Sequence, residues 1–181
     1  MGATLTIERS ALPAPASADE LCRVYAAAVS RFAAMMARSP ADAEDLAQEA
    51  LLRAVRSLGT FDPERGSMDS WLWRIVANVV KDSATRRKRI TDLVTRLGLL
   101  TPREVGSVED LVLERIRDEE LRAMLRTLPL RDQTLIALRF GADLDMHQIG
   151  EAVGLSSDSA SRALSRALAR LRARLEGINN D

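Results

Sequence analysis

Hydrophobic residues recur every three or four positions along most of the chain, which is the spacing of one face of an α-helix. The stretches with this pattern are 21–35, 46–58, 68–79, 111–128, 130–140 and 160–175. Ala, Leu and Arg, which favour helices, are abundant, and aromatic residues make up only 3% of the chain. The sequence therefore predicts an all-α fold.

Polar residues with the spacing of a capping box mark the start of several of these helices. In such a box, the first side chain accepts a hydrogen bond from a free backbone amide of the first turn. The side chain three positions later accepts one from the backbone amide of the first residue. The pairs are Ser17 with Glu20, Ser107 with Asp110, and Asp145 with Gln148. The last pair begins a short helix, which is followed by a turn with Gly154 and a long final helix. This order predicts a helix-turn-helix over about 145–165.

Breaks in the periodicity divide the chain into two small helical domains joined by a flexible linker. We predict a disordered tail over 1–16, a helical bundle over 17–89, a linker over 90–107 and a second domain over 108–177. The tail is rich in Ala, Pro and Ser. The linker is interrupted by two glycines and a proline.

The second predicted helix has an unusual outer face. Acidic and amide side chains surround one leucine there: Asp45, Gln48, Glu49 and Leu52. An exposed leucine among carboxylates suits a protein partner with basic residues. A solvent-exposed face that happens to carry a leucine is the alternative.

The third predicted helix carries an indole, an amide and two cations on the side away from its apolar face, and a basic cluster follows. The residues are Trp71, Arg74, Asn78 and Lys81, and then Arg86, Arg87, Lys88 and Arg89. Aromatic rings stack on unpaired bases, amides recognise base edges and cations neutralise phosphate, so this surface suits unpaired DNA. Trp71 as a core residue and the cluster as a solvated helix end form the alternative. Trp73 lies near the apolar face and is expected in the core.

The final helix places arginines four residues apart, at Arg162, Arg166, Arg170 and Arg174, with no acidic residue between Ser159 and Arg174. Neighbouring guanidinium groups repel, so an external anion such as DNA phosphate is expected to compensate them. In a helix-turn-helix, the start of this helix enters the major groove. The candidate DNA-contacting residues are Ser157, Asp158, Ser161, Arg162, Ser165 and Arg166.

Several classes of function find little support. The formal net charge is zero, so attraction to phosphate must come from local patches. Cys22 is the only cysteine and His147 the only histidine, and neither a glycine-rich phosphate loop nor metal-ligand spacing occurs. We therefore expect no catalytic residue, metal or cofactor. The sequence has no secretory signal and no apolar run long enough to insert in a membrane.

Three motifs resemble the small extracytoplasmic-function sigma factors of bacterial RNA polymerase, within the sigma-70 family. They are Asp42-Ala43-Glu44-Asp45-Leu46-Ala47-Gln48-Glu49, Trp71-Leu72-Trp73-Arg74-Ile75-Val76-Ala77-Asn78, and the basic run from Arg86 to Arg89. The C-terminal helix-turn-helix agrees with this resemblance, which covers about residues 18–176.

The resemblance implies that the first domain is sigma region 2 and the second is sigma region 4. Region 2 would bind the clamp helices of the polymerase β′ subunit through Asp45, Gln48, Glu49 and Leu52. It would also melt the minus-ten element, with Phe61 and Asn78 holding bases and Trp71, Arg74, Lys81 and Arg86 to Lys88 nearby. Region 4 would recognise the minus-thirty-five element. The family also implies cytoplasmic action and control by an anti-sigma factor, which can hold the protein at the membrane.

The C-terminal domain departs from the family pattern at two places. Members usually begin the first helix of the motif with Glu-Ile-Ala, where this chain has Gln148-Ile149-Gly150. They usually carry Val-Lys-Ser-Arg-Leu in the recognition helix, where this chain has Ala160-Ser161-Arg162-Ala163-Leu164. A regulator that binds duplex DNA through its helix-turn-helix without polymerase is the alternative function, and a helical enzyme is a more remote one.

Overall fold

The computed structural model describes residues 17–96 and 113–178, and every regular element in these ranges is a helix. The N-terminal half contains α1 (Ala18–Met36), α2 (Pro40–Ser57) and α3 (Met68–Arg96), with the short 3₁₀ turns η2 (Leu58–Thr60) and η3 (Pro63–Arg65) before α3. The C-terminal half contains α4 (Leu113–Thr127), α5 (Leu130–Phe140), α6 (Met146–Val153) and α7 (Ser157–Ile178). The predicted all-α fold is confirmed.

The predicted caps explain where several helices start. Ser17 accepts a hydrogen bond from the backbone amide of Glu20 at 3.2 Å. Asp145 and Gln148 form both bonds of a capping box at the start of α6. The pair formed by Ser107 and Asp110, like the predicted tail over 1–16, lies outside the described residues.

The N-terminal half is built around Trp73 of α3. Its side chain is fully buried, as the sequence predicted, and its ring meets that of Phe32 of α1 edge to face, with 5.6 Å between ring centroids. Leu72 and Val76 extend the same buried face of α3. Because large aromatic side chains remove much apolar surface from water, this contact fixes how α3 lies against α1.

Helix α3 does not end at Arg89, where the sequence analysis placed the start of the linker. It continues without a break to Arg96 and is 29 residues long. No proline or glycine occurs after Ser67 until Gly98, so nothing in the backbone interrupts the helix. The exposed Ile90 and Leu93 therefore belong to a helical extension of the N-terminal half.

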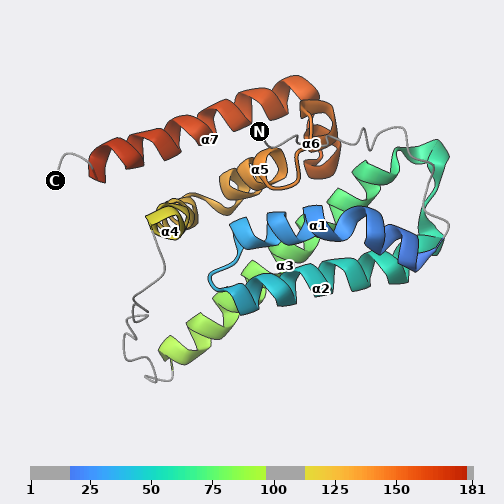
Figure 1. The fold of residues 1–181 in the computed structure, drawn as a ribbon, viewed down its shortest axis with the longest axis horizontal. Coiled ribbons are helices and arrows are strands. Elements are labelled where there is room, and N and C mark those ends of the chain that lie inside the picture. Colours follow the sequence, from blue (N-terminus) through green and yellow to red (C-terminus); the bar gives the residue numbers. More distant parts are fainter. Residues whose placement is uncertain (1–16, 97–112, 179–181) are drawn as a thin grey trace.

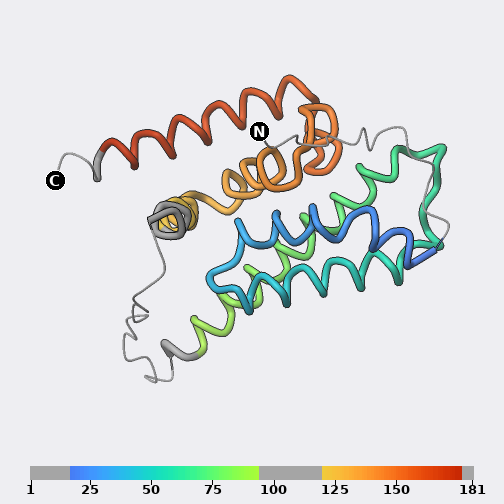
Figure 2. Tube along the Cα trace, in the orientation of Figure 1, coloured from blue at the N-terminus to red at the C-terminus, as the bar shows by residue number. Residues whose placement is uncertain are grey.

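The two halves pack against each other. Helices α4 and α5 contact α1, and α6 contacts α3, while α7 forms the outer edge of the molecule (Figure 1). The start of α3 lies beside α6, whereas its end points away from α6 (Figure 2). Gly141 makes the close approach between α5 and α1 possible, since a Cβ there would lie only 3.0 Å from the Cα of Phe32.

Replacement of Trp73 by Ala tests the role of this side chain in the core. We expect a loss of about 3–5 kcal/mol in the free energy of unfolding, because the substitution leaves a large cavity. Urea denaturation followed by circular dichroism measures this loss. Trp71→Ala is the matched control, since Trp71 is only partly buried, and it should cost clearly less. Equal losses for both variants would contradict the described core.

Candidate interfaces for protein and nucleic acid

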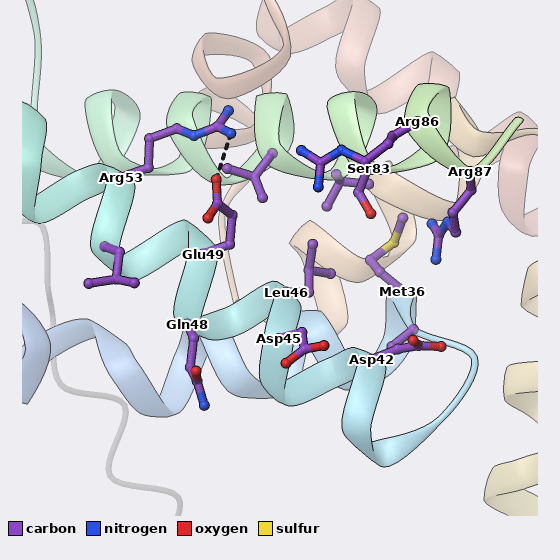
Figure 3. Close-up of a pocket in the computed structure, with 14 residues that line it drawn as sticks. Met36, Asp42, Asp45, Leu46, Gln48, Glu49, Arg53, Ser83, Arg86 and Arg87 are labelled. Atoms are coloured by element: carbon purple, nitrogen blue, oxygen red, sulfur yellow. Dashed lines mark hydrogen bonds and ion pairs between the residues drawn. The ribbon is translucent and has the colours of Figure 1, made fainter. Parts of the chain in front are cut away.

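A groove of about 440 Å³ runs between α2 and α3. All four residues predicted to face a protein partner line it, namely Asp45, Gln48, Glu49 and Leu52. Figure 3 labels the first three of them. Leu52 is 50% exposed, which is high for a leucine within an amphipathic helix. The structure thus brings an apolar contact point and two flanking carboxylates together along one groove.

Arg53 joins the two walls of this groove. Its guanidinium group donates to Glu49 of α2 and to Asp82 of α3, each at 2.7 Å. The hydrogen bond to Asp82, followed by the one to Glu49, raises the pKa of Arg53. Glu49 therefore already has an intramolecular partner (Figure 3). Arg53 was not among the predicted site residues, although its spacing of four residues from Glu49 was a usable signal.

A second pocket, of about 380 Å³, lies at the start of α3. Phe61 and Trp71 line it together with Arg74, and the two rings meet edge to face at a centroid distance of 5.8 Å. Both aromatic side chains are partly exposed. Trp71 is therefore not sealed in the core, and this pocket offers ring surfaces beside a cation.

The remaining predicted nucleic-acid residues of α3 do not form one surface. Asn78 and Lys81 are exposed. Arg86 and Arg87 instead line the groove between α2 and α3. Lys88 lines a different pocket, beside Arg38 and Arg126, and Arg87 borders this pocket as well as the groove. Successive residues of a helix are rotated by about 100°, so three adjacent cations necessarily point in different directions.

In the C-terminal half, α6, the turn at Gly154 and α7 form the predicted helix-turn-helix. Gly154 has a φ of 73°, a left-handed conformation that favours glycine. The departure at Gly150 has a steric reason, because a Cβ there would lie 2.7 Å from the carbonyl oxygen of Leu155. The exposed residues at the start of α7 include all six predicted DNA contacts, namely Ser157, Asp158, Ser161, Arg162, Ser165 and Arg166.

One of the four evenly spaced arginines of α7 has an acidic partner within the protein. The four are Arg162, Arg166, Arg170 and Arg174. Arg170 forms an ion pair with Asp132 of α5, whose side chain is nearly buried. The expectation of an external anion along the whole stripe is therefore wrong for Arg170, which connects two helices of the same half. Sequence spacing could not show this, since Asp132 lies 38 positions away.

Comparison with known protein families covers both halves. Residues 21–90 match sigma-70 region 2, and residues 124–173 match sigma-70 region 4. The chain belongs to the sigma-70 family. The N-terminal half is thus region 2 and the C-terminal half is region 4. The α2/α3 groove and the Phe61 pocket lie within region 2, whereas the helix-turn-helix lies within region 4.

Curated relatives are of the extracytoplasmic-function type. The ECF RNA polymerase sigma factor SigE of Mycolicibacterium smegmatis is 31% identical over 156 residues, which cover 83% of this chain and 57% of the relative. BldN of Streptomyces coelicolor, another ECF sigma factor, is 33% identical, with 72% of this chain and 49% of BldN covered. This chain therefore spans about half the length of these two relatives.

Solved structures show the same fold at lower identity. CnrH in complex with the cytosolic domain of CnrY superposes with a TM-score of 0.63 at 21% identity, covering 88% of each chain. The sigma factor RpoE of Bartonella quintana, in complex with the anti-sigma factor NepR, gives 0.63 at 20% identity and covers 87% of this chain and 96% of RpoE. Within the described part of this sigma-70 family chain, none of the helices is both long and apolar enough to cross a membrane.

The bridge through Arg53 can be tested by a double-mutant cycle with Arg53→Ala and Asp82→Ala. We expect a coupling of about 0.5–1 kcal/mol in the free energy of unfolding, because the pair is partly exposed. The coupling should shrink when the salt concentration is raised from low to high, since ions screen exposed pairs. Additive effects at low salt would show that Arg53 does not bridge α2 and α3.

Proposed function

We propose that this chain is a sigma factor that binds core RNA polymerase and directs promoter-specific initiation of transcription. One observation carries the proposal: α3 separates two different surfaces of region 2. The groove shared with α2 presents Leu52 beside carboxylates, whereas the pocket at the start of α3 presents Phe61 and Trp71. The first suits a protein with basic residues, and the second suits unstacked bases.

The groove is the proposed site for the clamp helices of the β′ subunit. Leu52 would supply the apolar anchor, and Asp45, Gln48 and Glu49 would supply polar contacts around it. Glu49 would keep its bond to Arg53 and so present an oriented carboxylate. The curated relatives named above, called RNA polymerase sigma factors, support this assignment.

The pocket at the start of α3 is the proposed site of minus-ten melting. Removing a base from the stack costs a few kcal/mol, and stacking on an aromatic side chain offsets about 1–3 kcal/mol of it. Phe61 and Trp71 can stack bases, and Asn78 can recognise a base edge. Arg74 and Lys81 would contact the backbone. Region 4 would bind the duplex minus-thirty-five element through the start of α7.

As a sigma factor, the protein would act in the cytoplasm and would catalyse no reaction itself. An anti-sigma factor is its proposed inhibitor, since a solved structure with the same fold contains one. Such an inhibitor could hold it at the membrane. A polymerase-independent regulator is the second candidate, supported by the helix-turn-helix alone. It gives no role to the α2/α3 groove or to the pocket with Phe61 and Trp71.

Variants on the two surfaces of region 2 should separate binding from melting. We expect Phe61→Ala and Asn78→Ala to lower open-complex formation about tenfold or more, because captured bases lose their contacts, while polymerase affinity stays unchanged. Leu52→Asp should weaken polymerase affinity instead. Fluorescence anisotropy measures the affinity, and permanganate footprinting measures melting. Unchanged melting with Phe61→Ala and Asn78→Ala would refute the assigned role of those residues.

Region 4 variants should show which arginines contact DNA. We expect Arg162→Ala and Arg166→Ala each to weaken binding to minus-thirty-five duplex DNA and to reduce the slope of log affinity against log salt by about one. Arg23→Ala, an exposed change on α1, is the matched control and should change neither quantity. Binding titrations at several salt concentrations provide the measurement. Slopes equal to that of the parent protein would show that these arginines do not contact DNA phosphate.

A further inference from the structure

The contact between the two halves combines a shared apolar core with polar bonds, some of which join α6 to α3. Gln148 of α6 donates from its Nε2 to Oδ2 of Asp69 of α3 at 3.0 Å. The hydroxyl group of Ser70 donates to the carboxylate of Glu151, one turn further along α6. Asp69 and Ser70 are buried, with 3% and 2% of their surfaces exposed. These bonds join residues separated by 79 and 81 positions in the chain.

The capping box at the start of α6 fixes the orientation of the Gln148 amide group. Its Oε1 accepts from the backbone amide of Asp145 at 2.9 Å, so its NH₂ group must point the other way. That direction leads to Asp69. One side chain therefore caps α6 and donates across the interface at the same time.

A glutamate at position 148, as in the usual family pattern, could form the same cap. Its second carboxylate oxygen would then face the carboxylate of Asp69 at hydrogen-bond distance without a proton to share. Two carboxylates in a buried contact repel, so the donor amide of Gln148 is what makes this contact favourable. The departure from the family pattern at Gln148 thus has a consequence specific to this chain.

The same contact restricts the pocket proposed for the minus-ten bases. Glu151 lines that pocket together with Phe61, Trp71 and Arg74, so region 4 contributes a carboxylate to its wall. A nucleic-acid strand entering there would meet both the bulk of α6 and a negative charge.

We propose that Gln148 and Glu151 of α6 form a latch with Asp69 and Ser70 of α3, which keeps the free protein closed and its minus-ten pocket obstructed. That the latch inhibits promoter binding rests on the proposed function, whereas its effect on shape does not. The latch is reversible because Asp69 is buried with one hydrogen bond, and its Oδ1 has no donor among the described residues. Opening returns this carboxylate to water, which favours its charge.

Single-molecule energy transfer on the full chain measures the closed and open populations without DNA or polymerase. Donor and acceptor dyes are attached at Arg56→Cys on α2 and Ser161→Cys on α7, both exposed positions, in a Cys22→Ser background. We expect Gln148→Glu to lower the ratio of closed to open molecules about tenfold or more, since a hydrogen bond to a charged group becomes a repulsion. Asp69→Asn should raise the ratio, because it removes the buried charge and keeps an acceptor.

The double variant Asp69→Asn with Gln148→Glu decides whether the two side chains interact directly. Its new amide can donate to the new carboxylate, so the closed population should recover relative to Gln148→Glu alone. Ala173→Glu, which adds a charge at an exposed site of α7, should leave the populations of the labelled parent unchanged. If Gln148→Glu leaves the closed population intact, or if the double variant does not restore it, the latch is refuted. If circular dichroism shows that Gln148→Glu unfolds region 4, the closed-to-open ratio of Asp69→Asn alone decides whether the latch exists.

Binding of a fluorescent single-stranded minus-ten oligonucleotide to the free chain then tests the inhibitory role. Gln148→Glu should bind it more tightly than the parent does, because α6 no longer obstructs the pocket. A variant that opens in the energy-transfer experiment without gaining affinity would refute obstruction but keep the latch. If neither open nor closed protein binds the oligonucleotide with polymerase present, the proposed function fails while the latch stands.

Discussion

The packing of Trp73 against Phe32 fixes the rotation of α3 about its axis, and the functional surfaces of the N-terminal half follow from that rotation. A helix turns about 100° per residue, so once one face is buried the direction of every other side chain is set. Trp71 and Arg74 then line the pocket with Phe61, and Asp82 pairs with Arg53 of α2. A single buried contact thereby separates the proposed polymerase surface from the proposed DNA surface.

The same constraint shows how a chain without net charge can present separate surfaces to the two proposed partners, a basic protein and an anionic nucleic acid. Carboxylates gather on α2, and exposed cations lie on α3 and α7. Some charges of opposite sign form intramolecular ion pairs, as Arg53 does with Asp82 and Arg170 with Asp132. Exposed charges such as Lys81 and Arg166 remain accessible to a partner. Local patches therefore replace a global field as the source of attraction.

Local periodicity was sufficient to predict the helices, most caps and the buried position of Trp73, because these features depend on neighbours within a few residues. It also placed Leu52 correctly on an exposed face. It could not show that α3 continues past Arg89 or that Arg170 is paired with Asp132. The periodicity tells which side of a helix is buried but not which distant residue covers it. The contact of Gln148 with Asp69, 79 positions apart, is therefore visible only in the folded chain.

Transcription from a genomic DNA library by core RNA polymerase, with and without the purified chain, tests the central claim most directly. We expect RNA whose 5′ ends map to discrete sites, appear only when the chain is present, and share two upstream sequence elements at a fixed spacing. Transcript ends that are the same with and without the chain would contradict this claim. Tight binding of the chain alone to duplex DNA, without any such RNA, would favour the polymerase-independent regulator.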